Sequence, residues 1–261
     1  MKKEVDQAVL LTKKSSGILR LTLNRPAHRN ALSGQLIDEL IMQLVVAEQG
    51  RTVRVVVIAS QGTVFCAGHD LNELVTMNQP QRRQLLERCS ELMMTLQRIP
   101  QPVIAEVQGV ATAAGCQLVA SCDLAVAAAS ATFATPGVNI GLFCSTPAVA
   151  LSRAVPTKQA LKMLLTGEPV DAQWALQIGL ISDLVDADEL PQATRSLAER
   201  IASKSSACIS TGKQAFYRQQ GLPVAQAYAD AAAEMVRNLD SASAKEGISA
   251  FLQKRTPHWP D

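Results

Sequence analysis

Two short turns decide the fold expected of this chain: FCAGHDL at residues 65–71 and GVATAAGCQ at residues 109–117. In each, an apolar run typical of a strand ends in small residues, and a helical pattern begins. The first backbone N–H groups of a helix have no partner inside it, so such a turn suits an anion or oxyanion. Each turn alone is more often a tight packing turn. Two of them in one parallel α/β body can place two N–H donors around one carbonyl oxygen, which makes an oxyanion hole.

Strand and helix patterns alternate outward from these turns. Ser33 can cap a helix over Gly34–Gln49, because apolar residues recur there at helical spacing. Buried strands are expected at Ile18–Leu23, Val53–Ile58, Pro102–Val107 and Asp123–Ala128. The last quarter of the sequence is mostly helical. The pattern predicts an α/β protein whose helical C-terminal part packs on the body or on a neighbouring subunit.

Composition excludes several classes of protein. The 261 residues carry a net charge of only +2, and no basic run interleaves with aromatic residues, so we expect no nucleic-acid partner. Between Glu106 and Arg153 lie 46 residues whose only charge is Asp123. Pro136 and Pro147 would break a helix there, so this gap indicates a buried core with turns and no membrane span. Asp123, at the start of a buried strand, is expected to be structural.

The cysteines, the histidines and the start of the chain bear on cofactors and on the cellular compartment. Six cysteines form no C-x-x-C pair, and three histidines have no second ligand at i, i+4, so no metal site is expected. The start, Met1–Asp6, lacks an apolar core and an Arg/Ser-rich amphipathic pattern. These features predict reduced thiols, no targeting peptide and a cytoplasmic location.

Ordered motifs run through nearly the whole chain. They are LNRP at 23–26 with NAL at 30–32, FCAGHDL at 65–71, PVIA at 102–105 with Gly109, CDLAVA at 122–127, LTGE at 165–168, and FLQKR at 251–255. At this spacing the chain resembles the crotonase (enoyl-CoA hydratase/isomerase) superfamily. The resemblance implies a spiral of strand-strand-helix turns over residues 1–196. It also implies a helical region over 197–261 that assembles homotrimers or dimers of trimers.

The resemblance also implies a ligand and a set of contact residues. The ligand is an acyl-CoA thioester; the CoA is part of the substrate, and no separate cofactor is implied. By position, the backbone N–H groups of His69 and Ala114 would form the oxyanion hole. The CoA contacts would fall on Arg29, Ala31, Ala67, Asp70 and Leu71. Phe251 and Lys254 would approach CoA from the C-terminal tail, of either the same or a neighbouring subunit. A lysine near the nucleotide phosphates is electrostatically sensible.

The chain departs from the family pattern where hydratases carry two glutamates. Those positions here are Gln117 and Gly137, and neither side chain exchanges a proton near neutral pH. Gln117 can hold a water but cannot deprotonate it. The oxyanion glycine is replaced by Ala114, which keeps the N–H and adds a methyl group. Classical hydration is therefore expected to be weak.

Substitute acids or bases are not obvious in the sequence. The His69 side chain is a candidate if it turns toward the acyl group, but a solvent-facing or locally bonded histidine is favoured. Cys144 lies close to the position of a catalytic tyrosine in related decarboxylases. It is a candidate nucleophile, although a buried packing cysteine is favoured.

Three functions remain open. The first is an enzyme that acts on a CoA thioester through a stabilised enolate, and decarboxylation of a malonyl-type CoA needs no general base. The second is a non-catalytic acyl-CoA binder or oligomeric partner. The third is a hydratase that uses other groups.

Overall fold

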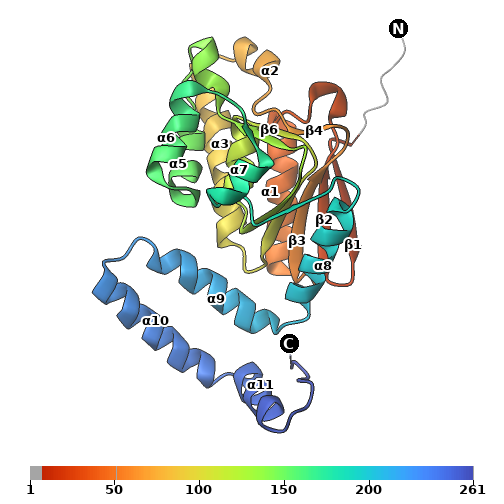
Figure 1. Ribbon diagram of the computed structural model, residues 1–261, viewed down its shortest axis with the longest axis vertical. Helices are drawn as coiled ribbons and strands as arrows, with labels where there is room; N and C mark the ends of the chain where they lie inside the picture. The colour runs from red at the N-terminus through yellow and green to blue at the C-terminus, as the bar shows by residue number, and fades with distance from the viewer. Residues whose placement is uncertain (1–7, 51, 261) are drawn as a thin grey trace.

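The computed structural model describes residues 8–50 and 52–260, and its centre is a six-stranded sheet (Figure 1). The strand order is β1-β2-β3-β5-β7-β10. The first pair is antiparallel, and every other neighbouring pair is parallel. The strands are β1 (Leu10–Ser15), β2 (Ile18–Leu23), β3 (Val55–Ser60), β5 (Val103–Val107), β7 (Leu124–Ala128) and β10 (Asp183–Val185). Segment 1–7, on which the expectation about a targeting peptide rested, lies outside the described residues.

A second sheet of four short strands runs beside the first, in the order β4-β6-β8-β9. Its strands are β4 (Val64–Cys66), β6 (Val110–Thr112), β8 (Thr132–Ala134) and β9 (Val170–Asp171). Three times, a strand of the large sheet is followed by a strand of the small sheet and then by helix. These repeats are β3-β4-α2, β5-β6-α4 and β7-β8-η2-α5. The chain therefore forms the spiral of strand-strand-helix turns that the resemblance implied.

Helices cover both faces of the large sheet. One face packs against α1 (Gly34–Gln49) and α3 (Gln79–Arg98), and the other against α8 (Leu190–Ala202). The predicted cap of α1 is confirmed, because the Ser33 side chain accepts a hydrogen bond from the Leu36 N–H at 3.2 Å. The remaining elements are η1 (Pro26–His28), α2 (Leu71–Thr76), α4 (Ala114–Ser121), η2 (Pro136–Ile140), α5 (Ser145–Ala154), α6 (Thr157–Thr166) and α7 (Ala172–Gln177).

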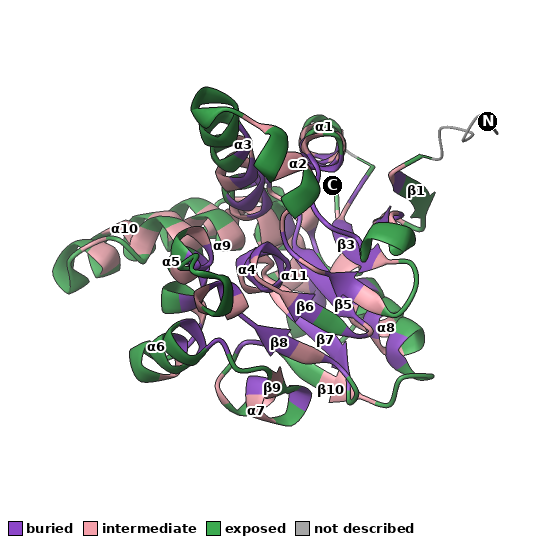
Figure 2. Cartoon of the chain, turned by 90° about the horizontal axis from the view of Figure 1, so that it is seen from above, coloured by how far each residue is buried: buried purple, intermediate pink, exposed green. Residues whose placement is uncertain are grey.

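Much of the stretch of low charge lies in the core, although residues 139–143 within it are exposed. Strands β7 and β8 and helix α4 of this stretch are largely buried, as is β5 just before it (Figure 2). In the part of the chain that the structure describes, no helix combines the length and the apolar character needed to cross a membrane. Asp123 is structural, as predicted: its carboxylate accepts hydrogen bonds from the Val103 N–H, the Lys213 ammonium and the Tyr217 hydroxyl.

Three helices form a C-terminal arm that extends away from the sheets (Figure 1). They are α9 (Ser206–Gln219), α10 (Val224–Leu239) and α11 (Ala242–Leu252). Large apolar side chains on the arm are exposed, among them Tyr228, Met235 and Phe251. The expected boundary at 196/197 falls inside α8, just before this arm.

Candidate functional site

The two glycine-bearing turns singled out in the sequence lie against each other. They follow β4 and β6, which are parallel neighbours. A Cβ added to Gly68, whose φ is +93°, would lie 2.9 Å from Ala113 Cβ and 3.3 Å from Ala114 N. A Cβ on Gly115 would lie 2.1 Å from the Cys66 carbonyl oxygen. Contact this close requires glycine at both positions.

The closely packed turns leave two backbone donors unused. Ala113 holds φ 51° and ψ −119°, and the chain then enters α4 at Ala114. Neither the Ala114 N–H nor the His69 N–H donates a hydrogen bond to any group in residues 8–50 and 52–260. Two neighbouring turns thus carry N–H groups without an acceptor in the described chain.

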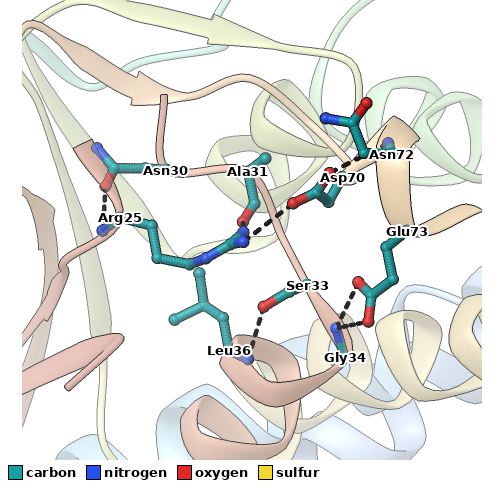
Figure 3. Close-up of polar contacts among 9 residues, drawn as sticks. All are labelled: Arg25, Asn30, Ala31, Ser33, Gly34, Leu36, Asp70, Asn72 and Glu73. Carbon is teal, nitrogen blue, oxygen red and sulfur yellow. Dashed lines mark hydrogen bonds and ion pairs between the residues drawn. The ribbon is translucent and has the colours of Figure 1, made fainter. Parts of the chain in front are cut away.

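Arg25 joins the first turn to the segment after β2 (Figure 3). Its guanidinium donates to the Ala31 carbonyl oxygen at 2.6 Å and to an Asp70 carboxylate oxygen at 3.0 Å. The other Asp70 oxygen accepts from the Asn72 N–H at 3.2 Å and so caps α2. Burial acts to raise the pKa of Asp70, but Arg25 and the backbone N–H groups of Glu73 and Asn72 together outweigh it, and the pKa is lowered. The Asp70 carboxylate is therefore engaged within the protein.

Asn30 holds the same segment from its other side. This residue is fully buried in the left-handed region at φ 52°. Its side-chain oxygen accepts from the Arg25 N–H at 2.9 Å (Figure 3). Its amide donates to the carbonyl oxygens of Gln61 and Val64 at 2.8 and 2.7 Å. The structure thus ties the segment after β2 to the residues that precede the first turn.

The predicted CoA contacts of the core come together around these bonds. Ala67 N–H donates to the Arg29 carbonyl oxygen at 3.1 Å, and Leu71, which is half exposed, begins α2. Arg29, Ala67 and Leu71 lie beside the more buried Ala31 and Asp70. These five residues are called the surface segment. Sequence reasoning missed Arg25 and Asn30 as its organisers, although both lie in the quoted motifs. The role of Asn30 could have been predicted from the sequence, because asparagine close to a proline turn often holds the turn through its side chain.

Gln117 and Gly137, the two positions at which the resemblance placed glutamates, have different surroundings. Gln117 on α4 is 3% exposed, and its side-chain amide oxygen Oε1 has no hydrogen-bond partner in the described chain. A Cβ on Gly137 would lie 2.0 Å from the Leu142 carbonyl oxygen and 2.9 Å from Cys144 Sγ. The backbone of segment 141–144 therefore occupies the space into which a side chain at position 137 would project.

The two substitute candidates are poorly placed for proton transfer. Both ring nitrogens of His69 are buried and make no hydrogen bond of good geometry to a described group. Burial lowers the pKa of this imidazole, and the Leu32 backbone opposes the shift only in part. Burial raises the pKa of the Cys144 thiol, which is opposed by the Gly137 backbone. A buried packing cysteine, the favoured interpretation, agrees with this environment.

Phe251 and Lys254 lie at the end of α11, far from the turns of the same chain. Helices α11 and α2 lie at opposite ends of the molecule (Figure 1). The Phe251 ring is 82% exposed, and Lys254 has a φ of 55°. One copy of the chain does not bring these two residues to the surface segment at Asp70.

Comparison with known proteins identifies the family. The sequence profile of the enoyl-CoA hydratase/isomerase family matches residues 13–261. The chain belongs to this family. A crystal structure of an enoyl-CoA hydratase from Mycobacterium smegmatis superposes with a TM-score of 0.95 at 46% identity, covering 98% of this chain and all (100%) of that one. The expected crotonase-like α/β fold is confirmed.

Within the enoyl-CoA hydratase/isomerase family, one branch is especially similar. The mitochondrial enoyl-CoA hydratase domain-containing protein 3 of Danio rerio is 49% identical over 99% of this chain and 90% of its own length. The crystal structure of the human protein of that name superposes with a TM-score of 0.92 at 46% identity, covering 97% of this chain and 100% of that one.

The predicted cytoplasmic location is wrong. The five relatives that share 46–49% identity with the chain are all named as mitochondrial proteins. These names contradict the cytoplasmic prediction. Residues 1–7, from which the prediction came, are not described by the structure, and a sequence pattern at one end is weak evidence for a compartment.

Proposed function

We propose that the protein binds acyl-CoA thioesters and stabilises a thioester enolate at the backbone N–H groups of His69 and Ala114. One observation carries the proposal: the two turns are in contact, and each offers an N–H without an acceptor in the described chain. Donors fixed in advance around a developing oxyanion are worth about 10²–10³ in rate per hydrogen bond. Membership of the enoyl-CoA hydratase/isomerase family supports the choice of a CoA thioester.

Hydration is proposed to be slow in this protein. Addition of water to an enoyl thioester needs a group that takes a proton from the water and one that gives a proton to the α-carbon. Gln117 supplies neither, and Gly137 has no side chain. General acid–base groups of this kind typically contribute about 10²–10⁴-fold, so their absence costs about that factor.

Decarboxylation of a malonyl-type CoA is the second candidate. Loss of CO₂ leaves the electron pair on the α-carbon, so the enolate forms without a base, and the two N–H donors suffice for this step. Gln117 and Gly137 offer no group that exchanges protons, and burial lowers the pKa of His69. This lack of proton-transfer groups favours decarboxylation over hydration. A non-catalytic acyl-CoA binder is what remains if neither reaction occurs.

The assembly proposed is a homotrimer or a dimer of trimers built through the C-terminal arm. The exposed apolar side chains of α10 and α11 support it, since large exposed apolar patches mark interaction surfaces. In such an assembly, Phe251 and Lys254 would reach the CoA of a neighbouring subunit.

Binding and enolate stabilisation can be tested separately. Calorimetric titration with CoA and with acetoacetyl-CoA measures binding, and the near-ultraviolet absorbance of bound acetoacetyl-CoA reports its enolate. We expect saturable binding, an enhanced enolate band and release of CO₂ from malonyl-CoA. With crotonyl-CoA we expect turnover well below the ~10 s⁻¹ of a median enzyme.

Each negative result removes one part of the proposal. Absence of binding to every CoA compound would refute the acyl-CoA site. Binding without an enolate band and without CO₂ release would leave only the non-catalytic binder. Crotonyl-CoA turnover at ordinary rates that Gln117→Ala does not reduce would show that other groups transfer the protons.

A further inference from the structure

A cavity of about 320 Å³ lies between the β1–β2 hairpin and helix α8. In Figure 1, α8 lies across this end of the large sheet, beside β2 and β1. The lining comes from segments far apart in the sequence and shares no residue with the site described above: Lys13, Ser15, Ser16, Ile18, Arg20, Val57, Pro191, Thr194, Arg195 and Glu199. The volume falls at the lower end of the range usual for small-molecule sites.

Positive charge dominates the polar part of this cavity. Lys13, Arg20 and Arg195 line it, against the single carboxylate of Glu199. Neither Lys13 nor Arg195 forms an ion pair with a carboxylate of the described residues. Two cationic side chains are thus available to a ligand, and both are exposed at the rim.

Arg20 is the fixed cation of the cavity. Its Nη1 donates to Glu106 Oε2 at 2.9 Å, and its Nη2 donates to the other oxygen of the same carboxylate. Glu106 is only 6% exposed, so this bidentate pair holds the guanidinium plane in one orientation. A guanidinium has five N–H donors, and Glu106 takes two, so three remain for a ligand.

The wall of the cavity also contains an unsatisfied hydroxyl. Thr194 is fully buried, and its Oγ1 makes no hydrogen bond to any described group. A buried hydroxyl without a partner is costly and uncommon, so it indicates a ligand or an ordered water. Apolar contacts come from Ile18, Val57 and Pro191.

We propose that this cavity binds a small organic phosphate monoester. A dianionic phosphate matches the two cations without an ion pair, Lys13 and Arg195. Its oxygens can accept from the Thr194 hydroxyl and from the Arg20 N–H groups that Glu106 does not take. The apolar residues suit the organic group of such a ligand. The site lies along α8, away from the turns after β4 and β6, so the proposal is independent of the acyl-CoA proposal.

Calorimetric titration of the full chain with phenyl phosphate tests the proposal, with inorganic phosphate and benzoate as comparison probes. We expect saturable binding of phenyl phosphate that weakens as salt is raised from 20 to 150 mM. Arg195→Gln and Thr194→Val should each weaken it about tenfold, since hydrogen bonds to charged groups are the stronger kind. Arg200→Gln is the matched control, because Arg200 lies on the same helix, is exposed and does not line the cavity.

Thr194→Val also separates binding from folding. Removal of a hydroxyl without a partner should leave the melting temperature of the free protein unchanged or higher. No saturable binding of phenyl phosphate would overturn the proposal, and so would equal losses in Arg195→Gln and Arg200→Gln. Unchanged affinity in Thr194→Val would also refute it, and benzoate binding as tightly as phenyl phosphate would refute the assignment of a phosphate.

Discussion

The Lys213 ammonium lies 2.7 Å from a carboxylate oxygen of Asp123, and this ion pair joins the C-terminal arm to the large sheet. Lys213 also donates to the carbonyl oxygens of Leu96 and Gln101 at 2.7 and 2.8 Å. Its side chain is 6% exposed and that of Asp123 is 13% exposed. One lysine thus connects α9 with the end of α3, the segment before β5 and the start of β7.

Lys213→Met should destabilise the protein strongly. The substitution leaves the Asp123 carboxylate buried without its cation, and removal of one partner of a buried pair costs about 3–5 kcal/mol. Urea unfolding followed by circular dichroism measures the change. Arg218→Gln is the control, because its two ion pairs on the arm are exposed to solvent and should contribute little to stability. Equal losses in both variants would contradict the assigned role of Lys213.

Gly137→Glu should fail to restore hydration, even when it is combined with Gln117→Glu. The Leu142 carbonyl oxygen lies 2.0 Å from the Cβ position, so any side chain there forces segment 141–144 to move. We expect a lowered melting temperature and no gain in crotonyl-CoA turnover. Gly212→Ala is a matched control, since nothing lies within 4 Å of its Cβ position in α9. A stable double variant with restored turnover would show that this segment does not block the position.

Arg25→Gln should weaken CoA binding and lower stability together. The guanidinium holds the Ala31 carbonyl and the Asp70 carboxylate, so its loss releases both of these residues of the surface segment. We expect a stability loss of about 1–3 kcal/mol, typical for buried polar groups left without a partner. Calorimetric titration with CoA and urea unfolding measure the two effects. Arg88→Gln, which removes an exposed arginine with exposed partners, should change neither.

Lys254→Ala should reduce CoA affinity, because in the proposed assembly this lysine faces the nucleotide phosphates of a neighbouring subunit. The reduction should shrink as salt is raised. Calorimetric titration at low salt provides the measurement, and Lys245→Ala, an exposed lysine earlier on α11, provides the control. Affinity unchanged at low salt would exclude Lys254 from the site.

Thiol reactivity should single out Cys208, which is exposed. Burial raises the pKa of both Cys66 and Cys116 to about 12, so these thiols stay protonated through pH 10 in the folded protein. Burial also raises the pKa of Cys144. Iodoacetamide at pH 8 followed by peptide mass spectrometry should therefore modify Cys208 first. Cys144 reacting as fast as Cys208 would revive its candidacy as a nucleophile.

Local signals explain what could be predicted from the sequence. Helix α1 begins after Ser33 and ends at Gln49, as predicted, because its cap and its apolar spacing are both local. Strands β6 and β9 span three and two residues, too short for an alternating pattern to reveal them. The strand expected before the first turn is β4, but its place in a second sheet, like that of β6 and β9, becomes visible only through strand pairing.

In the candidate site, too, local features could be predicted from the sequence and long-range contacts could not. The two turns were predicted from their glycines, and the contact residues came from the resemblance to the family. The link between Arg25 and Asp70 spans 45 positions, and the close approach of Leu142 to Gly137 is made by backbone atoms. Neither relationship leaves a periodic or compositional trace, so both needed the structure.

The contact between the Gly68 and Gly115 turns has a consequence for protein engineering. Its geometry comes from main-chain atoms and from the Cβ atoms of Ala113 and Cys66, so it depends on these two glycines and little on longer side chains nearby. New proton-transfer groups introduced at position 117 would therefore be held against an unaltered frame. The glycine turns set the positions of the backbone atoms, and the side chain at position 117 sets the reactivity. Because the two are separate, the protein is a favourable starting point for introducing new catalytic side chains.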